Sequence, residues 1–176
     1  MNTNALISII CPDRVGLVSA VCGQIYDLGI NLNDTTFAVL GGGAEFTAVC
    51  EIPEDHTIKD IEESLLALDE LKDAQLSISK FDLSPVHSES GHITHRIVLQ
   101  GGDRPGLIAR LAEVFVEFKA NIVRLNSEKV PGRGDNQYEI RIAAWIPEEN
   151  VKSCLATVAN TAGQLSMKCH WNEISS

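Results

Sequence analysis

Apolar positions recur along the chain with two periods, the two-residue period of strands and the longer period of amphipathic helices. The run from Ala5 to Ile10 is typical of a strand, and Pro12 removes a backbone donor at its end. From Val15 onwards the period changes, and four apolar side chains share one helical face: Leu17, Val21, Ile25 and Leu28. Gly29 then predicts the end of this helix.

The rest of the first half predicts a hairpin, a second helix and a last strand. Residues 31–40 and 46–50 favour two strands joined by a glycine turn at residues 41–43. Pro53 ends the second of these strands, and Thr57 is typical of an N-cap. The helix that follows has an apolar face formed by Ile58, Ile61, Leu65 and Leu68. Residues 75–81 alternate as a strand, so the first half predicts the order β-α-β-β-α-β.

The second half repeats this pattern. The turn at residues 13–17, Asp-Arg-Val-Gly-Leu, returns 90 positions later at residues 103–107 as Asp-Arg-Pro-Gly-Leu. A strand at 93–99 precedes it, and a matching helix face follows: Leu107, Leu111, Phe115 and Phe118. Pro147-Glu148 matches Pro53-Glu54 after an insertion of four residues, which we place in a longer hairpin loop at 130–136. A helix with Val151, Leu155 and Val158 and a strand at 165–171 complete the copy.

The repeat predicts an α+β chain of two ferredoxin-like units, at residues 1–82 and 92–176, joined by a polar linker at 83–91. Each unit should form a four-stranded antiparallel sheet with both helices on one face. The other face would be uncovered and would carry apolar side chains of one strand parity, such as Ile7 and Ile9, and Ile97 or Val98. Because uncovered apolar surface favours association, we expect the sheets to pack on one another or on a second chain.

The repeated turn is the first candidate site. Backbone amides at a helix start lack partners and carry partial positive charge, so they can receive a carboxylate. Gly16 and Gly106 would let a ligand approach the main chain closely. The alternative is that Asp13 and Asp103 only cap their helices and that the glycines only permit tight packing. Capping does not require the arginine that each copy contains.

Asn31 and Asn121 are the second candidate feature, at the start of the strand that follows each first helix. The predicted order of elements suggests that each lies beside its repeated turn. An asparagine side chain can donate to a carboxylate and accept from an ammonium group, the two ends of an amino acid. The alternative is an asparagine that adopts a turn conformation after the helix.

Composition narrows the possible functions. The net charge of the 176 residues is −10; the first half has 4 basic and 14 acidic residues, and the second half has 10 of each. An acidic chain with 5% aromatic residues does not favour direct nucleic-acid binding. Five scattered cysteines without a Cys-x-x-Cys pair, and no basic leader or long apolar run, lead us to expect a cytoplasmic chain with reduced thiols and no membrane span. Neither the histidines nor any catalytic motif indicates a metal, a cofactor or an enzyme.

The repeated turn, followed about 15 residues later by Gly-Ile-Asn at 29–31 and Ala-Asn-Ile at 120–122, resembles the ACT domain. The resemblance covers both units, and residues 40–46 are similar to the glycine cleavage system transcriptional repressor group. It implies a non-enzymatic, homo-oligomeric (for example dimeric) regulator that binds a small amino acid such as glycine or serine between paired domains and acts through a protein partner. An ACT-type interaction module without ligand binding is the alternative.

By position, the resemblance implies a ligand site in each unit. Its residues are Asp13, Arg14, Val15, Gly16, Leu17 and Asn31 in the first unit, and Asp103, Arg104, Pro105, Gly106, Leu107 and Asn121 in the second. Val15 keeps the backbone amide that Pro105 lacks, so the two sites need not bind equally well.

Overall fold

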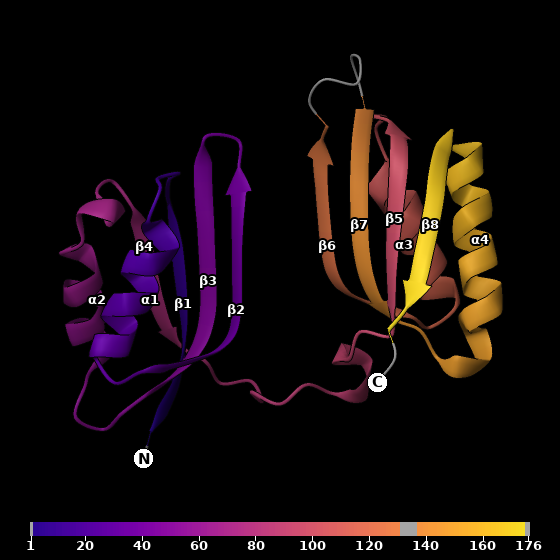
Figure 1. Ribbon diagram of the computed structural model, residues 1–176. Coiled ribbons are helices and arrows are strands. Elements are labelled where there is room, and N and C mark those ends of the chain that lie inside the picture. Colours follow the sequence, from indigo (N-terminus) through magenta and orange to yellow (C-terminus); the bar gives the residue numbers. More distant parts are fainter. Residues whose placement is uncertain (1, 131–136, 175–176) are drawn as a thin grey trace. The chain divides into compact units, whose positions relative to one another are not determined.

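The computed structural model describes residues 2–130 and 137–174 and forms two compact units (Figure 1). Unit 1 comprises residues 1–85 and unit 2 comprises residues 86–176, so the division falls within the segment predicted as a linker. Of the predicted long hairpin loop at 130–136, all but Val130 lies outside the described residues.

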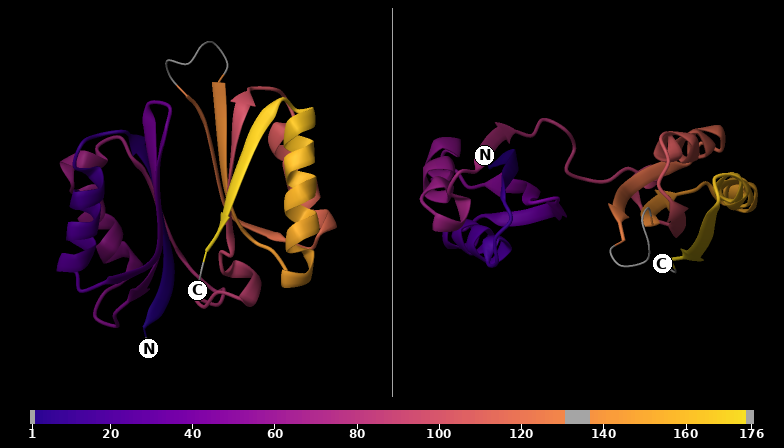
Figure 2. Two further views of the ribbon diagram at one scale, coloured as in Figure 1. Left: turned by 45° about the vertical axis from the view of Figure 1, so that its right-hand side comes forward. Right: turned by 90° about the horizontal axis from the view of Figure 1, so that it is seen from above.

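Unit 1 contains one four-stranded antiparallel sheet in the order β2-β3-β1-β4. Along the chain its elements are β1 (Thr3–Pro12), α1 (Leu17–Asp27), β2 (Asn31–Leu40), β3 (Gly43–Ile52), α2 (Ile58–Leu66), the 3-10 helix η1 (Asp69–Leu71) and β4 (Gln75–Lys80). Figure 2 shows both helices on one face of the sheet.

Unit 2 repeats this arrangement with the strand order β6-β7-β5-β8, again antiparallel. A 3-10 helix, η2 (Glu89–Gly91), precedes β5 (His95–Gly102), α3 (Leu107–Glu117), β6 (Asn121–Lys129) and β7 (Gln137–Trp145). The chain continues with η3 (Glu148–Asn150), α4 (Val151–Gln164) and β8 (Met167–Glu173). The predicted α+β class and the two ferredoxin-like βαββαβ units are confirmed.

Each unit has its own apolar core between its helices and its sheet. Alternate strand residues point to opposite faces, and Ile7 and Ile9 of β1 are fully buried on the helix side. The same parity in β5 buries Ile97, so Val98 lies on the other face. We call the sheet face without helices the open face of its unit. Because the large apolar residues of the central strands face the helices, the open faces contain many polar residues.

The helix starts are of two kinds. At α2, Thr57 Oγ1 accepts from the amide of Asp60 (3.2 Å), and the Asp60 carboxylate accepts from the amide of Thr57 (2.8 Å). The predicted N-cap at Thr57 is thus confirmed as a reciprocal capping box. At α1 and α3 the N-caps are Gly16 and Gly106, with φ angles of 93° and 84° and no side-chain cap. The alternative role of Asp13 and Asp103 as helix caps is therefore wrong, and the glycines are there because of their left-handed backbone.

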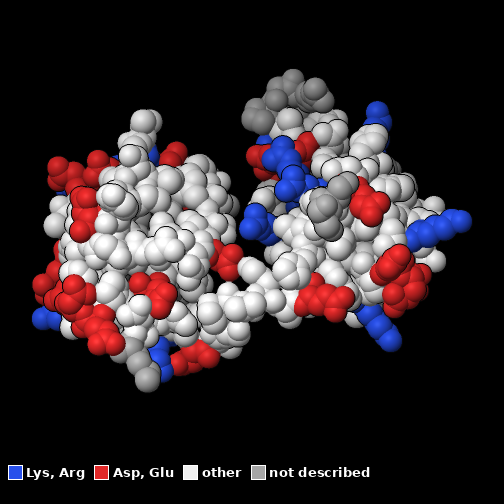
Figure 3. All heavy atoms as spheres, turned by 60° about the horizontal axis from the view of Figure 1, so that its bottom comes forward, with Lys and Arg blue, Asp and Glu red and all other residues white. Residues whose placement is uncertain are grey.

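The excess acidic charge belongs to unit 1. In Figure 3 the charged side chains visible on that unit are mainly acidic, whereas a group of Lys and Arg side chains gathers on one side of unit 2. All five cysteines are free thiols. Desolvation raises the pKa of the buried Cys50 and Cys154 thiols to about 11, so both side chains are protonated and serve as packing residues. No helix in the described part of the chain has the length and apolar content to cross a membrane.

His95 is a buried titratable side chain at the start of β5. The hydroxyl of Thr94 donates to the carbonyl of Ala144 (3.2 Å) and accepts from the amide of Ile146 (3.1 Å). Since the only proton of this hydroxyl is already donated, the Nδ1–H of His95 donates to the hydroxyl oxygen of Thr94 (2.9 Å). Burial lowers the pKa of His95 from its ordinary value of 6.5, and the nearby Glu173 opposes this shift.

Unit 2 should therefore lose stability as the pH falls below about 6.5. The pKa of His95 is lower in the folded state, so as the pH falls the unfolded chain binds a proton at His95 before the folded chain does. The contribution of His95 to the stability of unit 2 is therefore complete above the pKa of the unfolded state and is lost as the pH falls towards the pKa of the folded state. Both tryptophans, Trp145 and Trp171, lie in unit 2, so tryptophan fluorescence follows this unit alone. Thermal unfolding between about pH 7.5 and about pH 5 should show a falling midpoint. His95→Gln should flatten that dependence, and equal slopes in both proteins would contradict the assignment.

Candidate functional site

The two repeated turns have the same backbone geometry. In unit 2 the amide of Leu107 donates to the carbonyl of Arg104 (3.4 Å), and the amide of Arg110 donates to Gly106 (3.0 Å). In unit 1 the amide of Leu17 likewise donates to the carbonyl of Arg14 (3.3 Å), and the amide of Ala20 donates to that of Gly16 (2.9 Å). The next two amides of each helix start, those of residues 108 and 109 in unit 2 and of residues 18 and 19 in unit 1, donate to no backbone carbonyl of the described residues. Each helix start therefore offers two free donors at the positive end of its dipole.

The turn of unit 2 borders a cavity of about 290 Å³. Its lining residues are Asp103, Arg104, Gly106, Leu107, Ile108, Ala109 and Tyr138. The carboxylate of Asp103 lies 3.8 Å from the ammonium of Lys129, whereas the guanidinium of the exposed Arg104 forms no hydrogen bond or ion pair with any described residue. The cavity thus has a carboxylate, a free guanidinium and free backbone amides around it. These groups complement the carboxylate and the ammonium of one small zwitterion.

In unit 1 the arginine of the turn has a structural role. Arg14 donates to the carbonyls of Asp69 (3.1 Å) and Glu70 (3.0 Å) in η1 and lies 3.9 Å from the carboxylate of Asp73. These carbonyls are available because α2 ends after nine residues, whereas α4 continues for fourteen. Arg14 therefore stabilises the segment after α2, and its counterpart Arg104 has no such partner.

The expectation that Asn31 and Asn121 lie beside the turns is wrong. Asn31 pairs with Glu51, which also pairs with Asn4 at the start of β1, whereas the turn follows the other end of β1. Asn4 and Pro12 are eight positions apart along β1, so the asparagine and the turn are roughly 26 Å apart. Asn121 pairs with Trp145, at the corresponding end of the second sheet. Within either unit, a small ligand therefore cannot contact the turn and the asparagine together.

The remaining predicted residues differ in exposure. Leu17 and Leu107 are buried, and their side chains anchor the turns in the cores of the two units. Val15 is fully exposed, and Pro105 is exposed as well. Asn121 donates to the carbonyl of Ser90 in η2 (2.8 Å), whereas Asn31 is exposed at the start of β2.

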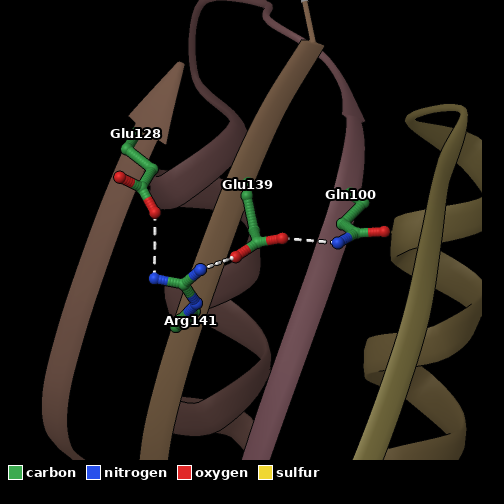
Figure 4. Close-up of polar contacts among 4 residues, drawn as sticks. All are labelled: Gln100, Glu128, Glu139 and Arg141. Atoms are coloured by element: carbon green, nitrogen blue, oxygen red, sulfur yellow. Dashed lines mark hydrogen bonds and ion pairs between the residues drawn. The ribbon is translucent and has the colours of Figure 1, made fainter. Parts of the chain in front are cut away.

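A polar network that the sequence reading missed crosses the open face of unit 2 (Figure 4). Arg141 pairs with Glu128 (2.9 Å) and with Glu139, whose carboxylate also accepts from Gln100. Glu139 is only 8% exposed although no helix covers it. The signal was the alternation of charged and apolar residues along β7. Across the described ranges, no group of three or more His, Cys, Asp or Glu side chains is arranged to hold a metal.

Comparisons with known proteins identify the fold. No protein-family model and no curated protein matches the sequence. The structure of a protein of unknown function from Galdieria sulphuraria matches 99% of this chain and 100% of its own, with a TM-score of 0.74 and 18% identity. A candidate glycine cleavage system transcriptional repressor matches 100% of this chain and 99% of its own, with a TM-score of 0.69 and 17% identity.

An ACT domain protein from Streptococcus pneumoniae matches 46% of this chain and 91% of its own, with 24% identity and a TM-score of 0.40. The two full-length matches cover both units of this chain. In its fold, this chain is a tandem ACT-like protein.

Proposed function

We propose that this chain is a non-enzymatic regulator that binds a small amino acid at the turn of unit 2, Asp103 to Leu107. The observation that carries the proposal is the cavity beside that turn, with Arg104 free and Asp103 next to it. The α-carboxylate of the ligand would accept from the amides of residues 108 and 109 and from Arg104. Its ammonium would lie against the carboxylate of Asp103.

The size of the cavity supports a small ligand. At about 290 Å³, it lies at the lower end of the range for small-molecule sites. Glycine and serine fit such a site better than amino acids with aromatic or long charged side chains. The turn of unit 1 is the weaker candidate, because Arg14 is already bonded to η1.

Ligand binding would act on a protein partner rather than on nucleic acid, in keeping with the net charge of −10. The full-length fold match with a candidate glycine cleavage system transcriptional repressor supports a place in the control of amino-acid metabolism, including that of glycine. A ligand that binds one conformation better than another changes partner affinity by a coupling of about 1–3 kcal/mol.

Calorimetry with the full chain tests the ligand site. Glycine and serine at millimolar concentration should release or absorb heat, and Arg104→Ala should weaken binding about tenfold or more because a hydrogen bond to a charged group is lost. Arg110→Ala removes an exposed arginine of α3 that does not line this cavity and should leave affinity unchanged.

Two results would contradict the proposal. If no amino acid in a panel produces heat or thermal stabilisation, the chain is better explained as an ACT-type interaction module. If binding occurs but Arg104→Ala does not weaken it, the ligand site lies elsewhere on the molecule.

A further inference from the structure

Strand register arranges the open face of unit 2 in rows that cross its four strands. One row consists of Arg124 of β6, Ala143 of β7, Arg96 of β5 and Asn172 of β8. The two arginines are therefore two strand spacings apart, about 10 Å between their Cα atoms. Ala143 lies between them and has only a methyl side chain, so it leaves the space above the sheet open. Two long side chains at this separation can direct both guanidinium groups towards one ligand above Ala143.

The positive charge of this row is not compensated within the face. Among the described strand positions of the open face, the acidic side chains are Glu128 and Glu139, which lie two rows away. Both pair with Arg141, which lies in the row between (Figure 4). Arg96 and Arg124 are exposed and form no hydrogen bond or ion pair with any residue in the described ranges. The row therefore presents two formal positive charges without a counter-charge.

The fold itself does not require the two arginines. The residues 90 positions earlier in unit 1 are Leu6, in place of Arg96, and Asp34, in place of Arg124. Leu6 is half-buried and pairs with Val49 in a sheet of the same strand order. Unit 1 thus forms its sheet with neither arginine, so packing does not account for them. Two like charges without a counter-charge repel each other, and a bound anion would remove that repulsion.

We propose that this row binds the phosphate group of a small metabolite between Arg96 and Arg124, with the side-chain amide of Asn172 beside it. A dianionic phosphate matches the two positive charges and has enough acceptor oxygens for two guanidinium groups, whereas a single arginine already satisfies one carboxylate. The net charge of −10 disfavours a polyanion such as nucleic acid. This site shares no residue with the amino-acid site proposed at the turn of unit 2, so it is independent of that function.

The next row of the face has a surface for the rest of a phosphorylated molecule. Trp145 follows Ala143 by two residues along β7, so it lies on the same face of the sheet. Its side chain is half-buried, and it pairs with Asn121 at the start of β6. An indole ring beside an anion site favours a ligand with a flat or apolar part attached to the phosphate. The ligand class is therefore a phosphoester rather than inorganic phosphate alone.

Calorimetry with the full chain and phenyl phosphate tests this site. We expect about one bound molecule per chain. Arg96→Gln and Arg124→Gln should each weaken binding about tenfold or more, because each removes a charged hydrogen-bond donor. Inorganic phosphate should depend on the same two arginines but bind less tightly, since it has no ring to contact Trp145. Acetate, with a single charge, should bind more weakly than either phosphate.

Two control variants separate this site from the rest of unit 2. Arg110→Gln removes an exposed arginine of α3, on the helix side, and should leave phosphate binding unchanged. Arg104→Ala should also leave it unchanged while it weakens glycine binding, so failure of either site is visible apart from the other.

Three results would overturn the phosphate site. The first is a native chain that binds neither phosphate at millimolar concentration. The second is unchanged binding in Arg96→Gln and Arg124→Gln proteins that circular dichroism shows to be folded. The third is loss of binding in Arg104→Ala alone, which would place the anion at the start of α3. Equal affinity for the two phosphates would contradict the role of Trp145 and the phosphoester class.

Discussion

Phe115→Ala should destabilise unit 2 by about 3–5 kcal/mol, because truncation of a fully buried phenylalanine removes apolar contacts and leaves a cavity. Phe115 lies on α3 with 1% of its surface exposed, packed in the core of unit 2. A unit of this size has a total stability of about 5–15 kcal/mol, so the loss is a large fraction of it. The urea midpoint of unit 2 should fall by roughly 2 M.

Tryptophan fluorescence provides the measurement, since both tryptophans are in unit 2. Phe46→Ala is the matched control, because Phe46 is equally buried in the core of unit 1. It should leave the fluorescence transition in place and lower a transition seen by far-ultraviolet circular dichroism. If Phe46→Ala moves the fluorescence midpoint as much as Phe115→Ala does, the two cores do not unfold separately.

Gly101→Ala should also destabilise unit 2, by about 1–3 kcal/mol or more, because the added methyl overlaps the backbone of β8. A Cβ at Gly101 would lie 2.8 Å from the carbonyl oxygen of Ser166 and 2.9 Å from Met167 Cα. The equivalent position of unit 1 is Cys11, and it accepts a side chain because the pairing of β1 with β4 ends one residue earlier, at Ile10 with Gln75.

Gly23→Ala is the control for Gly101→Ala. Gly23 is exposed within α1, and a Cβ there would meet no atom within 4 Å. The substitution should stabilise unit 1 by about 0.5–1 kcal/mol through helix propensity. Urea unfolding followed by fluorescence and circular dichroism distinguishes the two effects. A Gly101→Ala protein as stable as the native one would show that β8 moves aside without cost.

Periodicity was enough to predict the elements and the two units, because buried faces impose a regular spacing of apolar residues. The N-cap at Thr57 was also predictable, since its partner Asp60 is local in sequence. The place of Asn31 was not predicted correctly. α1 carries the chain back along the sheet, so β2 begins at the end opposite to the turn, and adjacency in the order of elements did not imply proximity.

The difference between Arg14 and Arg104 was beyond sequence reasoning for another reason. The two turns have nearly the same sequence, but the partners of Arg14 lie more than fifty residues away, where α2 ends. Whether an arginine at the turn is bonded or free thus depends on the length of a different helix. The same holds for the open face of unit 2, where Arg96 and Arg124 come into one row only once strand register is known.

At Gly16 and Gly106, the N-caps of α1 and α3, other residues are disfavoured by the handedness of the backbone rather than by the size of their side chains. A Cβ added at Gly16 or Gly106 would meet no atom within 4 Å, so volume is not what excludes other residues. The positive φ angles disfavour L-residues because of their own backbone, while the mirror-image enantiomer adopts such angles readily. A D-alanine placed there by chemical synthesis would retain the turn that an L-alanine strains. The constraint that the duplication preserved at both helix starts is therefore one of chirality.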